Sequence, residues 1–276
     1  MPTALLHDGS SIEVEVEVRG EGPAILLPVS TVVVKGEAAE QMRAWGVDPG
    51  LGHTLATALA EAGFRVITAD YEGHVMAHPK PSTLDAAAVA ADLLAIADAA
   101  GAQRFGYYGY SWLALAGLQL AVRTDRLTGL VMGGFPPLGG PYPAMLTVTL
   151  ATHRMAVANA SAPPALSVSE VGDWDSGEVT LTPAQSQQFV TLYESLAEFD
   201  ERAVRLDIPR LAFAGEKDNI RYGPRWDDAY VEIGAPLSAN RGALEAAGWR
   251  VEVIPGADHV AAMRAAVVLP LLTAFF

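Results

Sequence analysis

The strongest chemical signal in the sequence is a serine at the junction of a predicted strand and a predicted helix. Residues 107–114 read Tyr-Tyr-Gly-Tyr-Ser-Trp-Leu-Ala, and the serine is Ser111. A tight turn at such a junction exposes the side chain of its central residue and requires a small neighbour, which Gly109 supplies. The free N–H groups at the start of the following helix can stabilise an oxyanion. A serine hydroxyl is a weak nucleophile, so this chemistry also needs a general base.

The predicted base is His259. The chain has six histidines, and only His259 lies both after Ser111 and beyond a late predicted strand. It belongs to the loop Gly256-Ala257-Asp258-His259-Val260, which precedes a final predicted helix. This position places it on the same edge of a sheet as the serine.

The acid predicted to orient the histidine is Asp218, in the segment Gly215-Glu216-Lys217-Asp218-Asn219. A carboxylate bonded to the histidine Nδ1 fixes the tautomer of the ring and stabilises the imidazolium. Glu216 is a competitor for this role. Asp258 is a weaker one, because its side chain would have to reach back to the ring of its own neighbour.

These three residues follow strands that the apolar pattern predicts. Short apolar runs predict strands at 24–27, 64–69, 105–108, 130–132, 211–214 and 251–254. The alternation of apolar and charged residues over 12–18 predicts a half-exposed antiparallel strand. Helical patterns lie between the strands, so we expect an α/β fold with a doubly wound, mostly parallel sheet. Ligands of such sheets bind beyond the carboxyl ends of the strands.

One long segment interrupts the alternation. Residues 138–207 contain helical and irregular stretches without clear strands, and we expect an inserted helical cap there. The expected domains are therefore a core of residues 1–137 and 208–276 with a cap of residues 138–207. The cap is apolar at Met145, Leu146, Leu150, Met155, Phe189 and Leu192. These side chains could contact a hydrophobic substrate, the core or a second copy in a homodimer, and the sequence does not choose among them.

The order Ser111, Asp218, His259 resembles that of the α/β-hydrolase fold superfamily, whose serine hydrolases include carboxylesterases. The resemblance covers nearly the whole chain. The matching pieces are 26–30, 69–74, the turn at Ser111, 215–218 and 256–259. The resemblance implies an eight-stranded, mostly parallel sheet with a cap after the sixth strand, and a Ser-His-Asp catalytic triad.

The same resemblance implies an oxyanion hole made by the backbone N–H groups of Ser30 and Trp112. Val29 is the alternative to Ser30, whereas Pro28 has no N–H to donate. The sequence departs from the family pattern here, since many relatives carry His-Gly where this chain has Pro28-Val29. It departs again at Leu113, because the family has a small residue two positions after the nucleophile.

Five residues are candidates for a substrate pocket because they flank the predicted nucleophile or lie on the same edge of the sheet. They are Val29, Tyr71, His74, Tyr110 and Trp226. His74 matches a family position that is usually structural. Large aromatic side chains are also commonly packed in the core, so the sequence leaves both roles open for the other candidates.

The amino-acid composition limits the classes of partner that we expect for this protein. The formal net charge of −14 repels nucleic acids and anionic lipids, so we expect no nucleic-acid or membrane partner, and a small-molecule substrate instead. The absence of cysteine excludes thiolate chemistry and fits a cytoplasmic protein. No signal peptide or membrane-spanning run is evident. No cofactor is expected, and no metal either, since the acidic pair Asp173 and Asp175 lacks a third ligand at suitable spacing.

The function predicted from these residues is hydrolysis of a carboxylic ester or lactone of a small hydrophobic substrate through an acyl-enzyme. The alternative is non-ester chemistry on the same fold, as in C–C bond hydrolases, haloperoxidases, hydroxynitrile lyases or cofactor-free dioxygenases. A serine in place of an aspartate at position 111 disfavours dehalogenases and epoxide hydrolases. A non-catalytic binding module is the third hypothesis, disfavoured because all three triad candidates are present.

Overall fold

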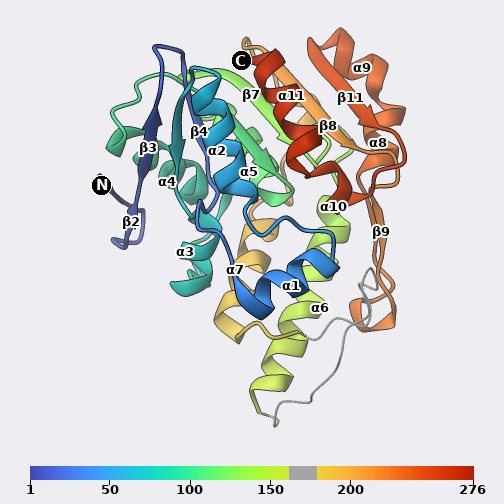
Figure 1. Ribbon diagram of the computed structural model, residues 1–276. Coiled ribbons are helices and arrows are strands. Elements are labelled where there is room, and N and C mark those ends of the chain that lie inside the picture. Colours follow the sequence, from blue (N-terminus) through green and yellow to red (C-terminus); the bar gives the residue numbers. More distant parts are fainter. Residues whose placement is uncertain (162–178) are drawn as a thin grey trace.

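A seven-stranded sheet forms the centre of the computed structural model, which describes residues 1–161 and 179–276 (Figure 1). The strands lie in the order β11-β8-β7-β6-β4-β5-β3, and every neighbouring pair is parallel except β3 with β5. Their bounds are β3 (Glu15–Val18), β4 (Ala24–Leu27), β5 (Arg65–Thr68), β6 (Phe105–Tyr110), β7 (Leu127–Gly133), β8 (Arg210–Gly215) and β11 (Trp249–Ile254). The predicted α/β class and mostly parallel sheet are confirmed.

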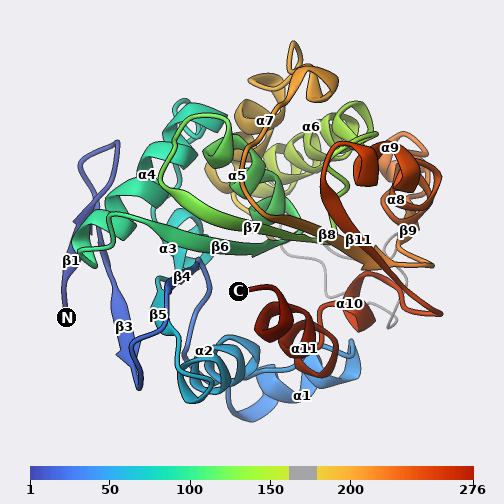
Figure 2. The same ribbon diagram turned by 90° about the horizontal axis from the view of Figure 1, so that it is seen from above.

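Helices cover both faces of this sheet, as a doubly wound fold requires. Helices α2 (Leu51–Glu61) and α11 (Ala265–Phe275) lie on one face, and α4 (Ala86–Ala99) and α5 (Trp112–Ala121) lie on the other (Figure 2). The two buried faces form separate hydrophobic clusters. Successive residues of a strand point to opposite faces, so Tyr107 of β6 packs in one cluster and Tyr108 in the other.

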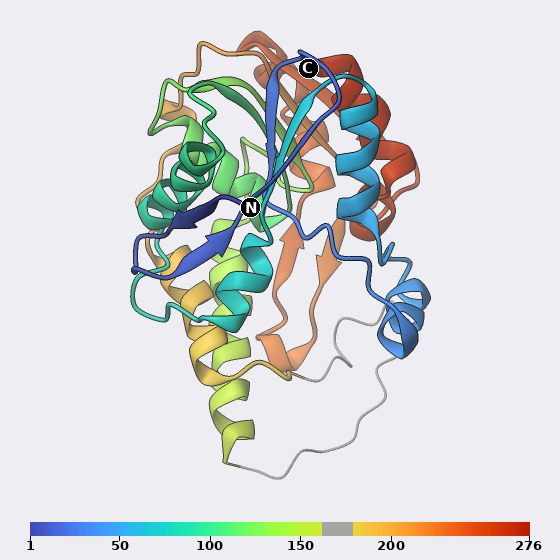
Figure 3. The ribbon, with the colours of Figure 1, turned by 60° about the vertical axis from the view of Figure 1, so that its left-hand side comes forward.

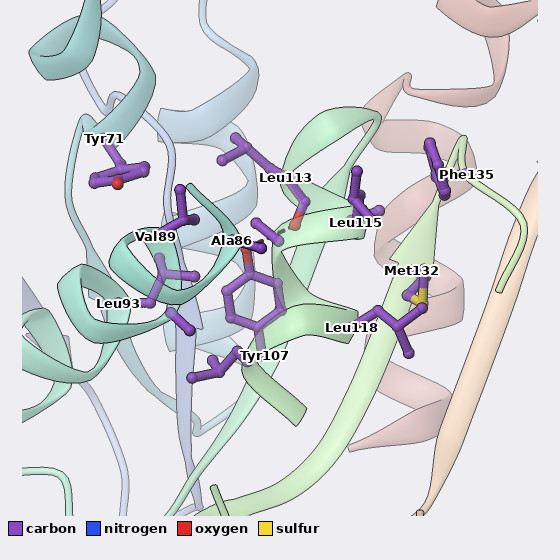
Figure 4. Packing of buried hydrophobic residues seen from close by; sticks show 14 of the residues in the cluster. Tyr71, Ala86, Val89, Leu93, Tyr107, Leu113, Leu115, Leu118, Met132 and Phe135 are labelled. Carbon is purple, nitrogen blue, oxygen red and sulfur yellow. Dashed lines mark hydrogen bonds between the residues drawn. The ribbon is translucent and has the colours of Figure 1, made fainter. Parts of the chain in front are cut away.

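The packing between β6 and α5 positions the start of that helix. Tyr107 is fully buried, and its hydroxyl donates a hydrogen bond to the Leu113 carbonyl at 2.8 Å (Figure 4). Its ring occupies the space beside Gly117, where an added Cβ would lie 2.4 Å from the ring. The helix can therefore approach the strand closely only because residue 117 is a glycine.

The main sheet has seven strands in the described residues, so the predicted count of eight strands in this sheet is wrong. The prediction of one continuous strand over 12–18 is also wrong. The chain instead divides into β2 (Ser11–Glu13) and β3 on either side of Val14, which is fully buried. Strand β2 pairs with β1 (Thr3–Leu5) in a separate two-stranded sheet, which stands beside the core (Figure 3). The His7 backbone N–H donates to the buried Asp92 of α4 at 2.7 Å and anchors this hairpin. Ile12 and Val14 face inward as the alternation predicts, but Val18 is 55% exposed, and the alternation does not specify which strand each half pairs with.

Two helices of the predicted cap lie beyond the carboxyl edge of the sheet (Figure 3). They are α6 (Tyr142–Ala160) and α7 (Pro183–Glu194), which pack against each other. Thr182 and Gln185 form a capping box that starts α7. Gln188 of α7 donates to the Val75 carbonyl at 3.1 Å, which ties this helix to the core. The division into a core and a cap of residues 138–207 stays a prediction, and Asp173 and Asp175 lie outside the described residues.

The remaining elements connect these layers. They are α1 (Gly36–Ala44), α3 (Tyr71–Ala77), the short helices η1 (Glu201–Ala203) and η2 (Pro224–Trp226), the hairpin β9 (Asn219–Arg221) and β10 (Tyr230–Glu232), α8 (Gly234–Ala239), α9 (Arg241–Ala246) and α10 (His259–Ala262). None of the helices in the described part of the chain is long and apolar enough to cross a membrane.

Candidate active site

Ser111 occupies the turn between β6 and α5 with a strained backbone. Its φ of 57° and ψ of −128° lie in a region that residues with a side chain rarely adopt. The Ser111 N–H donates to the Gly133 carbonyl of β7 at 2.8 Å, and the Ser111 carbonyl accepts from the Ala114 N–H at 2.9 Å. The surrounding strand and helix therefore hold the turn in place, as the turn predicted from the sequence requires.

Leu113, which departs from the family pattern, fits this turn because the small residue that the turn needs is at position 109. A Cβ on Gly109 would lie 2.2 Å from the Leu113 carbonyl oxygen, so the turn can close only with glycine at 109. The Leu113 side chain itself points into the hydrophobic cluster and is 6% exposed. The core therefore accommodates a leucine where the family has a small residue.

His259 and Asp218 meet beyond the carboxyl ends of β11 and β8. The His259 Nδ1 lies 3.0 Å from Asp218 Oδ1 and 2.9 Å from Oδ2. Asp218 is fully buried, while the His259 side chain is 16% exposed. The carboxylate therefore fixes the ring through Nδ1 and leaves Nε2 for another partner.

The two competing acids are engaged with backbone groups. Glu216 accepts a hydrogen bond from the Gly256 N–H at 2.8 Å, and Asp258 accepts one from the Ala261 N–H at 2.8 Å, which caps α10. The Lys217 N–H also donates to the Ala257 carbonyl at 2.8 Å. These bonds join the loops after β8 and β11, so the geometry pairs His259 with Asp218.

Burial dominates the electrostatics of this pair. Loss of hydration raises the pKa of the Asp218 carboxyl above its ordinary value of 3.8, although the hydrogen bond from His259 partly opposes the shift. Tyr110 adds a neutral contact, because its hydroxyl donates to the His259 carbonyl at 2.6 Å and its ring lies 5.0 Å from the imidazole. Burial raises the pKa of Tyr110 well above its usual range, so this hydroxyl stays protonated.

Ser111 and His259 lie at the same end of the sheet, joined through Gly134 and Tyr110. A Cβ on Gly134 would lie 3.0 Å from the His259 ring, and the Gly134 N–H donates to the Phe213 carbonyl at 2.8 Å. No hydrogen bond joins Ser111 to His259 in the ranges 1–161 and 179–276. In enzymes without substrate such bonds are commonly long and tighten only when substrate binds.

Solved structures with the same arrangement of strands and helices include hydrolases of several kinds and an epimerase. An enol-lactonase from Burkholderia xenovorans LB400 is 18% identical, with a TM-score of 0.60 over 99% of both chains. A lipase in an open form is 20% identical, with a TM-score of 0.61 over 99% of this chain and 96% of the lipase. An epoxide hydrolase from Vigna radiata is 15% identical, with a TM-score of 0.58 over 99% and 95% of the two chains. The chain has the α/β-hydrolase fold.

Sequence comparison adds nothing to this structural likeness. No protein-family model and no curated protein sequence matches the chain. At identities of 20% or less the solved structures establish the α/β-hydrolase fold. The chemistry must be argued from the residues of the site.

The two predicted oxyanion donors have free backbone N–H groups in this α/β-hydrolase fold. Trp112 is the first residue of α5, where a helix leaves its N–H groups without internal partners. Val29, the alternative to Ser30, instead donates its N–H to the Leu27 carbonyl at 2.8 Å. No such bond engages the Ser30 N–H within the described residues. Ser30 follows β4, which pairs directly with β6, so both donors lie at the same edge.

The five pocket candidates divide into three groups. Val29 and His74 line a cleft of about 360 Å³ together with Ser30. Tyr110 lies against His259, as described above. Tyr71 and Trp226 are buried side chains, 0% and 5% exposed, which donate to Asp92 at 2.8 Å and to Thr152 at 3.1 Å respectively.

The placement of Tyr71 and Trp226 corrects the expectation that they line a pocket, because their polar atoms are satisfied inside the protein. The His74 Nε2 and the Ser10 hydroxyl share a hydrogen bond of 2.9 Å. Burial, with the charge of Lys80 next, lowers the pKa of His74.

One contact beside Ser111 was not expected from the sequence. The Trp112 indole N–H donates to the Glu72 carboxylate at 2.9 Å, and its ring meets Phe189 of α7 edge-on at 5.5 Å. Glu72 lies in α3, which starts where Asp70 accepts from the Gly73 N–H at 3.0 Å. That helix-start pattern could have been recognised, but it does not reveal a partner 40 residues away.

Within residues 1–161 and 179–276, no group of three or more histidine or acidic side chains is placed to hold a metal ion. The pair Asp218 and His259 is arranged as a hydrogen-bonded dyad. The site can therefore do acid–base chemistry on a nucleophile held nearby.

Proposed function

We propose that this protein is a serine hydrolase that cleaves a carboxylic ester or lactone of a small hydrophobic substrate through an acyl-enzyme. The observation that carries the proposal is the bond between His259 Nδ1 and the buried Asp218 carboxylate, at the sheet edge where Ser111 directly precedes α5. A histidine held in this way is a base that can activate a serine hydroxyl. The hydrolases with the same fold agree with this class of reaction.

The first half of the proposed reaction forms the acyl-enzyme. The Ser111 Oγ attacks the carbonyl carbon of the substrate while its proton passes to His259 Nε2. The carbonyl oxygen becomes an oxyanion, held by the N–H groups of Trp112 and Ser30. The intermediate then collapses, the C–O bond to the alcohol breaks, and the leaving oxygen takes the proton from His259.

The second half releases the acid. A water molecule gives a proton to His259 Nε2 and attacks the acyl carbon. Collapse of this second intermediate breaks the bond to Ser111 Oγ, which recovers its proton from His259. The Asp218 carboxylate stabilises the imidazolium at both stages without taking the proton itself. In a lactone the leaving alcohol remains attached to the acid, so the product is a single hydroxy acid.

A hydrophobic substrate fits the surroundings of the nucleophile. The Trp112 ring, next to Ser111, meets the Phe189 ring of α7 edge-on, with 5.5 Å between the ring centres. An apolar group that reaches Ser111 therefore meets aromatic side chains from both α5 and α7. We propose that residues 138–207, which contain α6 and α7, act as a cap over this site.

Ester hydrolysis is the better proposal than epoxide opening despite the likeness to an epoxide hydrolase. The turn between β6 and α5 carries a serine at position 111, whereas epoxide hydrolases of this fold use an aspartate nucleophile. A serine acts on an acyl carbon, where the oxyanion donors of Trp112 and Ser30 have a role. An epoxide has no carbonyl oxygen for them to hold.

The test is hydrolysis of p-nitrophenyl acetate, p-nitrophenyl butyrate and a γ-lactone by the native protein and two matched variants. Ser111→Ala should lower kcat by about 10⁴-fold or more. Ser238→Ala, at an exposed serine of α8, should leave it unchanged. Equal activity of the native protein and Ser111→Ala would exclude the proposed nucleophile.

A further inference from the structure

A second cleft lies beside the sheet, away from the residues of the candidate active site. Its volume is about 540 Å³, and it is bordered by the loop before β8, by α9 and by the start of β11. Arg210 begins β8 and Trp249 begins β11, and the register of the two strands sets these residues side by side. Asp218 and His259 follow the opposite ends of the same strands. The cleft is therefore separate from the proposed chemistry.

Three arginines line this cleft in a protein whose formal net charge is −14. They are Arg202, Arg205 and Arg210. Arg205 donates to the carbonyls of Arg202 and Val204 at 2.6 Å and 2.8 Å. Arg210 donates to the Ile208 carbonyl at 2.7 Å and to the Ala247 carbonyl. These acceptors carry no net charge, so they orient the guanidinium groups without neutralising them.

Carboxylates do not neutralise the three arginines in the described parts of the chain. None of the ion pairs there includes any of the three. Glu201 is the one acidic side chain that lines the cleft, and its two oxygens accept from the N–H groups of Gly139 and Gly140. Glu201 is thus held by the loop after β7, and the cleft keeps an excess of positive charge.

Apolar side chains line the cleft together with the arginines. They include Leu118, Leu244 and Trp249, which belong to the hydrophobic cluster. The Arg210 guanidinium lies 5.9 Å from the centre of the Trp249 ring, so a cation and an aromatic face are presented together. A volume of this size is in the range of small-molecule sites and far exceeds that of an inorganic ion.

We infer that this cleft binds a small organic anion with an apolar ring, of the aromatic carboxylate class. The carboxylate would accept hydrogen bonds from the arginines, whose planar guanidinium groups match two oxygens at once. The ring would pack on Leu244 and Trp249. This binding site is independent of the proposed esterase activity, because none of its residues belongs to the candidate active site.

The probe for this site is 2-naphthoate, compared with the neutral 2-naphthamide by isothermal titration calorimetry. The two compounds share the ring and differ in charge, so the native protein should bind the naphthoate about 10-fold or more tightly than the amide. Equal affinity for the two compounds would overturn the inference, because the arginines would then contribute nothing.

Variants at the rim of the cleft locate the binding. Ala243 lines the cleft on an exposed part of α9, so Ala243→Glu adds a negative charge there and Ala243→Gln adds the same bulk without charge. The glutamate variant should weaken naphthoate binding about 10-fold relative to the glutamine variant. Both should hydrolyse p-nitrophenyl butyrate as the native protein does.

Arg205→Gln removes one positive charge from the cleft, and Arg250→Gln is its matched control. Arg205 is exposed, and within the described residues it donates hydrogen bonds to the carbonyls of Arg202 and Val204. Arg250 is also exposed, pairs with Glu252 at 3.0 Å and does not line the cleft. Arg205→Gln should weaken naphthoate binding about 10-fold, and Arg250→Gln should leave it unchanged. Naphthoate binding that is the same in Arg205→Gln, or in both Ala243 variants, would place the ligand elsewhere and refute the site.

Discussion

Replacement of Asp218 by asparagine separates the activity of the site from its stability. Asparagine keeps the shape of the side chain and can still bond to the His259 ring, but it carries no charge and can also stabilise the wrong tautomer. The proposed mechanism needs the carboxylate to stabilise the imidazolium. We therefore expect Asp218→Asn to lower kcat by about 10⁴-fold, as is typical of this change in a serine triad.

The same substitution should make the protein more stable at neutral pH. Asp218 is fully buried, and burial raises the pKa of its carboxyl above the ordinary 3.8. The folded state thus holds the proton more tightly than the unfolded chain. As the pH rises above 3.8 the unfolded chain ionises first, so the native protein loses stability until the pH passes the raised pKa. Each unit of raised pKa costs about 1.4 kcal/mol above that point.

The assay is urea unfolding of both proteins, followed by tryptophan fluorescence between pH 4 and pH 7. The free energy of unfolding of Asp218→Asn should exceed that of the native protein by about 1 kcal/mol at pH 7, and the difference should shrink toward pH 4. Asp227→Asn, at a carboxylate that is 54% exposed and pairs with Arg154, should show no comparable gain. A variant that is less stable than the native protein at pH 7 would refute the account of Asp218 as a buried, ionised carboxylate.

Three further predictions follow from single contacts. Ser111→Gly should raise the free energy of unfolding by about 1 kcal/mol, because glycine adopts a φ of 57° without strain, while it abolishes esterase activity; a loss of stability would show that the turn is not strained. Tyr110→Phe removes only the hydroxyl that donates to the His259 carbonyl, so kcat should fall about 10-fold with KM unchanged, and full recovery of kcat at any pH would argue against a positioning role. Asp8→Asn should lower the free energy of unfolding by about 3 kcal/mol, since it leaves the Lys80 ammonium, whose side chain is 1% exposed, without its carboxylate. Burial would raise the pKa of Asp8, but hydrogen bonds from Lys80 and a neighbouring serine hold it well below its usual range, so the native protein should keep this contribution above pH 3.8 and lose it only in stronger acid, as urea unfolding across that range would show.

The sequence predicted the sheet and the edge that carries the site because its central strands are short apolar runs. In a parallel sheet the carboxyl ends of such runs meet, so Ser111, Asp218 and His259 could be placed at one edge from their positions alone. The turn at Ser111 was recognisable because Gly109 stands where a Cβ would meet the Leu113 carbonyl at 2.2 Å.

Contacts between distant parts of the chain were beyond such patterns. The choice of Asp218 over Glu216 depends on the Gly256 N–H, which holds Glu216 away from the histidine. Tyr71 was a pocket candidate because it follows a strand, yet it lies in the core with its hydroxyl on Asp92. Residues 12–18 alternate as one strand would, but pairing partners on either side of Val14 divide them.

The most direct test of the account is covalent labelling with a fluorophosphonate, followed by intact-mass and peptide-fragment mass spectrometry. The proposed mechanism predicts one phosphonyl group per chain, attached to Ser111. His259→Ala should slow this labelling about 100-fold or more, because the serine then lacks its base. No adduct, an adduct on a residue other than Ser111, or labelling of Ser111 at the native rate in His259→Ala would contradict the central claim.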